Sequence, residues 1–163
     1  MRDTLRLLIN RDLDSFSREV ELFPDDILLW KTLPGIANSA GNLGLRAAGN
    51  LQYFIGAVLG GSGYVRHRDL EFSRRDGTRA EIRDGLARAR EVVADTLSRL
   101  TDEDLSKPYA ELLGGRRLRT GDFLLHLSTH LAFHLGQAGY LRRALTGDAT
   151  SSGALSNTML PTA

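Results

Sequence analysis

The chain contains no cysteine among its 163 residues, and this absence excludes disulfides, thiolate metal ligands and a cysteine nucleophile together. It fits a reducing compartment, and any thiol chemistry would need a thiol supplied from outside. Net charge is also small, since 21 Lys and Arg residues are balanced by 20 Asp and Glu residues. Such a balance gives no strong field for attracting nucleic acid or an anionic membrane, so neither is expected as a partner.

Long apolar runs are missing as well. The longest, residues 51–61, is too short to span a bilayer, and the charged start MRDTLRLLINRDLDSF is unlike a signal peptide. We therefore expect a soluble, cytoplasmic protein. At this length, with 42% hydrophobic residues, one core is expected, and we predict a single bundle over residues 1–147 followed by an extended tail over residues 148–163.

Apolar residues recur at helical spacing in four long segments, which predicts four long helices and no strand. The clearest begins at Thr78, where Thr78 and Glu81 have the spacing of a capping box. The fold class is therefore all-α, a four-helix bundle with a long crossover connection. The predicted helices cover about residues 4–23, 39–59, 78–100 and 120–146, the last capped by Thr120 and ended by Gly147, with Arg142 and Arg143 near its negative end.

The segments between these helices contain most of the prolines and several glycines. Residues 25–36 are predicted to form a short helix or turn that places the only tryptophan, Trp30, in the core. The charged stretch over residues 60–77 is predicted to be a crossover loop that lines the mouth of a pocket. Residues 107–119 are expected to be irregular or a short hairpin.

Three of the four histidines lie in the sequence HLSTHLAFHLGQ. Because four residues make slightly more than one helical turn, His126, His130 and His134 share a slowly drifting face. Two imidazoles spaced by four residues can bind one zinc-like cation. Leu127 stands where a zinc protease has its glutamate, so peptidase chemistry is not supported. The alternative is that the imidazoles are packed and hydrogen-bonded inside the bundle.

The sequence HLSTHLAFHLGQAGYLRR, together with AAGNLQYFIGAVLGGSGYVRHRDLEF, resembles the DinB/YfiT-like superfamily of four-helix-bundle metalloenzymes. The resemblance implies a divalent metal such as Zn or Ni, a homodimer and, as in some members, S-transferase or isomerase chemistry with a low-molecular-weight thiol. It also implies that His130 and His134 are two of the metal ligands. The third family ligand is a histidine on the second helix, one turn before an Asn, and here that position is Arg46.

Arg46 cannot be a metal ligand, because an arginine stays protonated and has no lone pair to donate. Two interpretations remain open. In the first, a metal binds weakly through His130, His134, water and the side-chain oxygen of Asn50. In the second, Arg46 replaces the positive charge of the metal and binds an anionic group, while the nearby cation keeps the histidines neutral.

Further residues around the motif are weaker candidates. His126 is expected to be a core residue or to orient a ligand, with direct metal ligation as the alternative. Gln137 and Tyr140 follow the motif at one-turn intervals, so they are candidates for hydrogen bonds to a substrate or for capping the polar seam. His67 is expected to be solvated and Tyr53 to be in the core.

Three functions are compatible with these residues, and none assigns a catalytic residue. The first is a metal-dependent transferase of a low-molecular-weight thiol, or a hydrolase, with a degenerate metal site. The second is a non-catalytic protein that binds a small anion or acts in a stress response after losing the metal. The third is association of subunits through the histidine face. In the first two, the partner is a small-molecule ligand.

Overall fold

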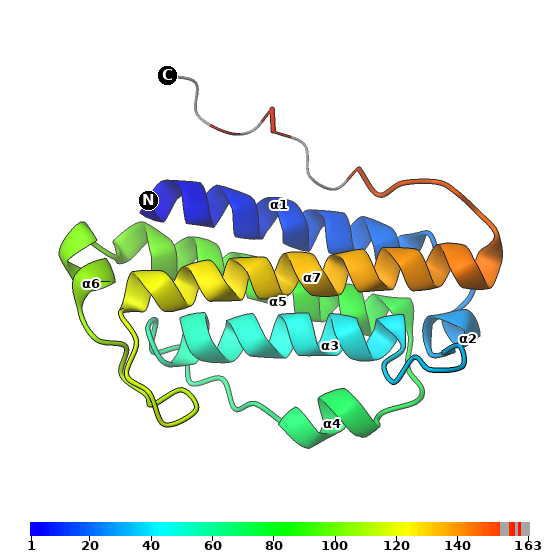
Figure 1. Ribbon diagram of the computed structural model, residues 1–163, viewed down its shortest axis with the longest axis horizontal. Coiled ribbons are helices and arrows are strands. Elements are labelled where there is room, and N and C mark those ends of the chain that lie inside the picture. The colour runs from blue at the N-terminus through cyan, green and yellow to red at the C-terminus, as the bar shows by residue number, and fades with distance from the viewer. Residues whose placement is uncertain (154–156, 159, 161–163) are drawn as a thin grey trace.

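The computed structural model describes residues 1–153, 157, 158 and 160. Its four long helices are α1 (Arg2–Glu21), α3 (Ala40–Leu51), α5 (Arg79–Arg99) and α7 (Thr120–Thr146). Helix α1 packs against α5 and α7, and α3 packs against the same two, so the four enclose one core (Figure 1). No β-strand occurs in the part of the chain that the structure describes. The predicted all-α four-helix bundle with a long crossover is confirmed.

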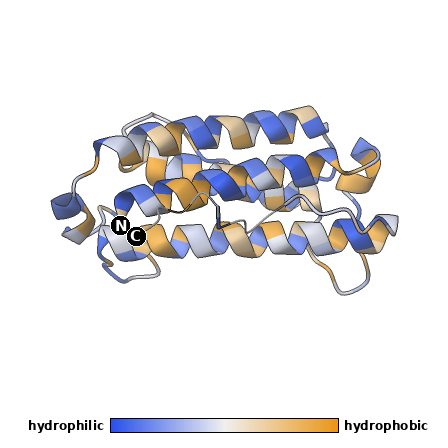
Figure 2. Cartoon of the chain, turned by 90° about the horizontal axis from the view of Figure 1, so that it is seen from above, coloured by the Kyte–Doolittle hydropathy of each residue, from blue (hydrophilic) through white to orange (hydrophobic). Residues whose placement is uncertain are grey.

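Each long helix is amphipathic, and its apolar stripe forms the core. Hydrophilic and hydrophobic residues alternate along every helix in Figure 2, as a helix with one buried face requires. Helix α1 shows the pattern most simply, with buried residues three or four positions apart: Leu5, Ile9, Leu13, Phe16 and Val20.

The second predicted helix is interrupted in its hydrogen bonding. Helix α3 continues into a π-helix, Gln52–Ala57, in which the Val58 amide donates to the Tyr53 carbonyl at 3.0 Å. A single π-helical turn inside an α-helix is common at functional sites. Gly56 lets this segment approach α5 closely, because a Cβ there would lie 2.3 Å from a methyl group of Val92.

The crossover between α3 and α5 contains a helix that the sequence pattern did not reveal. Helix α4 (Arg68–Ser73) lies along the outside of α3 (Figure 1). Asn42 fixes it there, since its amide nitrogen donates to the carbonyl oxygens of Glu71 at 3.0 Å and Arg74 at 2.9 Å. The segment is too short to show a helical period in the sequence, and its position depends on these contacts with α3.

The shorter connections agree with the predictions except at Thr120. Helix α2 (Asp26–Leu29) precedes Trp30, which is buried and donates its indole N–H to the Gly77 carbonyl at 2.8 Å. Helix α6 (Asp102–Ser106) leads into residues 107–119, which form two isolated antiparallel bridges. Thr120 was wrongly predicted to cap α7: it lies inside the helix, and its hydroxyl donates to the Lys107 carbonyl at 3.0 Å.

The C-terminal end of α7 is held by a buried ion pair. Helix α7 ends at Gly147, as predicted. Arg142 was expected to act on the helix dipole, but it is fully buried and its guanidinium donates to Glu19 on α1 and to the carbonyl of Thr150. The Ser152 carbonyl accepts a hydrogen bond from Arg18, so the beginning of the predicted tail lies against α1.

Among the described residues, no helix combines the length and the apolar character that a membrane-spanning helix needs.

Candidate functional site

The three histidines of α7 differ in burial because the helix face drifts. Each step of four residues rotates the side chain by about 40° beyond a full turn. His126 is exposed and stacks on Phe123, His130 is partly buried, and His134 is only 3% exposed. The ring centres of His130 and His134 lie 4.3 Å apart, whereas the ring centres of His126 and His130 lie 6.0 Å apart. The resemblance assigned the metal to His130 and His134, and these two form the closer pair.

Gln137 fixes the proton on the buried imidazole. The Nδ1 atom of His134 lies 2.9 Å from the side-chain oxygen of Gln137. An amide oxygen only accepts hydrogen bonds, so Nδ1 carries the hydrogen and Nε2 presents a lone pair. This Nε2 atom is buried and has no hydrogen-bond partner among the described residues. His134 therefore offers an unused acceptor inside the bundle.

Arg46 projects from α3 toward the crossover and the histidines. Its guanidinium carbon lies 4.3 Å from the centre of the Phe72 ring on α4, a favourable cation–π distance. Within the described part of the chain it has neither a hydrogen bond nor an ion pair. Burial lowers the pKa of Arg46, and the negative charge of Glu71 opposes this. The side chain stays charged, and it forms no ion pair with the described residues. We use the word groove for the seam between α3 and α7 that carries Arg46, Asn50, His130 and His134.

The crossover adds further arginines at the edge of the groove. Arg66 forms a two-pronged ion pair with the buried Glu71, with N–O distances of 2.8 and 2.6 Å. Gly49 on α3 makes room for this pair, since a Cβ there would lie 2.1 Å from a carboxylate oxygen of Glu71. Arg68 lies 4.9 Å from the centre of the Phe72 ring. Glu71 is thus paired with Arg66. Three arginines, Arg46, Arg66 and Arg68, therefore lie near this one carboxylate.

The charge of Arg46 on α3 affects the pKa values of the histidines on α7. Burial is the main reason that the pKa of His130 falls to about 4, and the neighbouring His134 and the charge of Arg46 lower it further. Burial also lowers the pKa of His134; Arg46 adds to this effect, while the bond to Gln137 opposes it. Both imidazoles are therefore neutral near pH 7, in agreement with the expectation that a nearby cation would disfavour their protonation.

Asn50 contributes a second unused acceptor. It lies one turn beyond Arg46 on α3, and its side-chain oxygen is buried without a hydrogen-bond partner among the described residues. A buried polar atom that lacks a partner is costly unless a ligand, ion or water satisfies it. The oxygen of Asn50 and Nε2 of His134 are therefore two buried acceptors whose cost a hydrogen-bond donor would relieve.

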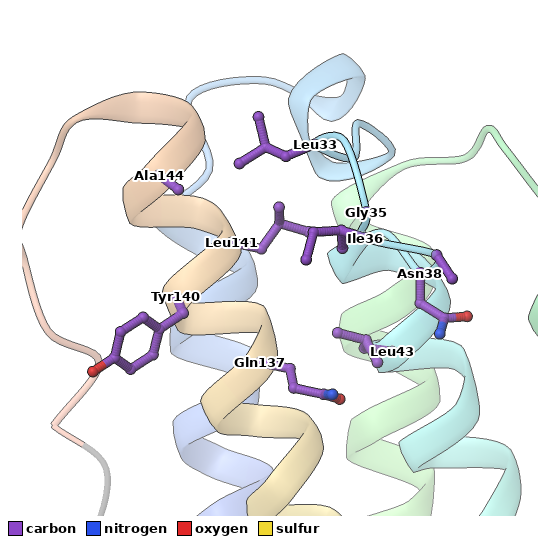
Figure 3. Close-up of a pocket in the computed structure, with 10 residues that line it drawn as sticks. Leu33, Gly35, Ile36, Asn38, Leu43, Gln137, Tyr140, Leu141 and Ala144 are labelled. Carbon is purple, nitrogen blue, oxygen red and sulfur yellow. The ribbon is translucent and has the colours of Figure 1, made fainter.

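The remaining candidates lie farther from this groove. Tyr140 is 80% exposed, and Figure 3 shows its ring turned away from the neighbouring cavity, which Gln137 also lines. His67 is exposed at the start of α4. Tyr53 is only partly buried and donates its hydroxyl to Glu111 at 2.7 Å, so it is not a simple core residue.

The groove residues do not fit the three-histidine metal centre that the resemblance implies. His130 and His134 supply two imidazoles, but the third position carries Arg46, whose fixed charge opposes a nearby divalent cation. No group of three His, Cys, Asp or Glu side chains suited to a metal was found in the described part of the chain. The arrangement is better suited to an anion beside neutral hydrogen-bonding groups.

The sequence did not single out Phe72, Arg66 or Glu71 as parts of the site. Their segment, YVRHRDLEF, was noted only for its family resemblance and its charge. Spacing gave no signal for the ion pair, because Arg66 precedes α4 and lies five residues before Glu71, whereas side chains on a helix pair three or four residues apart. Nothing local showed that Phe72 would lie under Arg46.

Comparison with known proteins agrees with this fold. A family model of the DinB superfamily matches residues 9–138, which include α3, the crossover and most of α7. The chain therefore belongs to the DinB superfamily. Members of this superfamily often bind metals. A search of curated proteins found no match.

Proposed function

We propose that this protein is a non-catalytic DinB-superfamily member that binds a small anionic molecule in the groove between α3 and α7. Arg46 is the anion-binding residue. The observation that carries the proposal is the unpaired guanidinium of Arg46 next to two neutral imidazoles, at the position where the family resemblance implies a metal ligand.

The chemistry of the groove defines the ligand more closely. A planar guanidinium suits a carboxylate or phosphate group, which it can bind through two parallel hydrogen bonds. The two unused acceptors, Asn50 Oδ1 and His134 Nε2, call for hydrogen-bond donors on the same molecule. A carboxylate that also carries a hydroxyl or amide N–H meets both requirements.

Binding of lactate, which has a carboxylate and a hydroxyl, tests the proposal. We expect lactate to shift the NMR signals of the His134 imidazole, and Arg46→Ala to weaken binding about tenfold or more, because a charge-assisted hydrogen bond contributes about 1.5–3 kcal/mol. The matched control is Arg117→Ala, which removes an exposed arginine from residues 107–119 and should leave binding unchanged. Equal binding by the wild type and Arg46→Ala would contradict the proposal.

Metal content separates this proposal from the metal-dependent transferase or hydrolase that the resemblance implies. We expect untagged protein to contain much less than one Zn or Ni per chain, and Arg46→His to gain metal because it restores a third imidazole. Stoichiometric metal in the wild type would show that His130 and His134 suffice and that the anion proposal is wrong.

A further inference from the structure

An apolar cavity lies between the N-terminal end of α3 and the C-terminal end of α7. It has a volume of about 490 Å³, within the range of small-molecule sites, and loop 33–38 closes one side of it. Figure 3 shows this loop and α7 facing each other across the cavity. The apolar lining comes mainly from Leu33, Ile36, Leu43, Leu141 and Ala144.

The loop holds an apolar side chain where water can reach it. Ile36 is 47% exposed although it borders the cavity, and it follows Gly35, whose φ of +80° turns the chain after Pro34. An exposed isoleucine beside other apolar groups gains stability when a ligand excludes water from it. The cavity is therefore suited to the apolar part of a molecule.

Two residues that line the cavity also lie close in sequence to Arg46 and His134. Gln137 lines the cavity and also accepts the hydrogen bond from His134. Leu43 lines it on the other side and precedes Arg46 by three residues. Three residues span about 4.5 Å along a helix, so one small molecule can reach from the cavity to the guanidinium.

The cavity itself offers no charge for an anion. None of the described residues that line it is charged, and its polar groups are limited to Asn38, Gln137 and Tyr140. Placing a carboxylate among the apolar groups would cost its hydration without an opposite charge in return. The charged part of a ligand must therefore lie at Arg46 and the apolar part in the cavity.

We propose that the ligand is an amphiphilic carboxylate, whose head binds Arg46 and whose apolar chain of several carbons occupies the cavity between loop 33–38 and α7. This inference rests on the proposed function for the position of the head group. It adds a specificity site, because the cavity selects for the size of the apolar chain.

Calorimetric titration with acetate, butanoate, hexanoate and octanoate tests the chain-length dependence, with the matching alcohols as uncharged controls. We expect affinity to rise about fourfold per added methylene until the cavity is filled. The alcohols should bind at least about tenfold more weakly than the acids of equal length. Arg46→Ala should remove this preference for the acids.

A variant that fills the cavity completes the test. Ala144 is exposed on α7 and borders the cavity, so Ala144→Trp should block the long chains while leaving acetate binding intact. Ala87→Trp makes the same change at an exposed position of α5 away from the cavity and should bind as the wild type does.

The outcomes distinguish this inference from the proposed function. If Arg46 is needed for acetate but octanoate binds no more tightly, the amphiphile is wrong and the anion site stands. If acids and alcohols bind equally and Arg46→Ala has no effect, both proposals are wrong. If Ala144→Trp changes the oligomeric mass in solution instead of the affinity, a second copy of the chain covers the cavity and the inference is overturned.

Discussion

Helix α7 takes part in two polar clusters that differ in how completely their charges are paired. At its C-terminal end, Arg142 is fully buried and is bound by Glu19, Asp148 and the Thr150 carbonyl. In its middle, the buried Nε2 atom of His134 has no hydrogen-bond partner and Arg46 on α3 has no ion pair among the described residues. In the first cluster, the charge of Arg142 is paired within the protein, and these contacts join α1, α7 and the C-terminal segment. The second leaves its polar atoms available, as a binding site must.

The largest loss of stability is expected at the cluster around Arg142, whose charges are paired. Glu19→Gln should lower the free energy of unfolding by about 3 kcal/mol, because it leaves the buried Arg142 without its main counter-ion. Arg46→Gln should change it by less than about 1 kcal/mol, because only the cation–π contact with Phe72 is lost. Urea unfolding of both variants measures the difference.

A control for the buried pair is Glu21→Gln, which removes the exposed partner of Arg83. Exposed ion pairs contribute little, so its effect should be less than about 1 kcal/mol. If Glu19→Gln were no more destabilising than Glu21→Gln, the distinction between the two clusters would be lost.

An intermediate effect is expected in the pH dependence of stability. The folded state holds the pKa of His130 at about 4, below its ordinary value of 6.5, so the unfolded chain binds more protons between these values. The His130 contribution is therefore fully present above about pH 6.5 and is lost as the pH falls toward 4. Thermal unfolding of the wild type and His130→Gln over this range should show a shallower acid decline in the variant. Parallel curves would contradict the assignment.

The smallest effect on stability is expected for Gln137→Leu, because the amide is exposed and the change removes one hydrogen bond, to His134. Its effect on the tautomer should be clear. Nitrogen-15 NMR of the wild type should show His134 protonated at Nδ1, and the variant should shift toward protonation at Nε2. An unchanged tautomer would show that another group fixes the ring.

The same two clusters show what the sequence could and could not predict. The histidine helix was predicted correctly because its period and its ending at Gly147 are local features. The burial of Arg142 was missed because its partner Glu19 lies on α1, far away in the sequence. Phe72 was missed because α4 is too short to show a helical period and is fixed by Asn42 from another helix.

The π-helix after Asn50 was missed for a related reason. Its residues have ordinary helical spacing, and the change from α to π hydrogen bonding leaves no pattern in the sequence. Arg46 was the exception among the candidate residues, since the resemblance alone marked it as a departure, and its charge lowers the pKa of both histidines.

Anomalous diffraction from crystals grown with 3-bromolactate and zinc tests the central claim most directly, since it locates bromine and zinc separately. The account predicts a bromine peak beside Arg46 in the α3–α7 groove and no zinc at the histidines. A zinc peak between His130 and His134, with no bromine near Arg46, would contradict it.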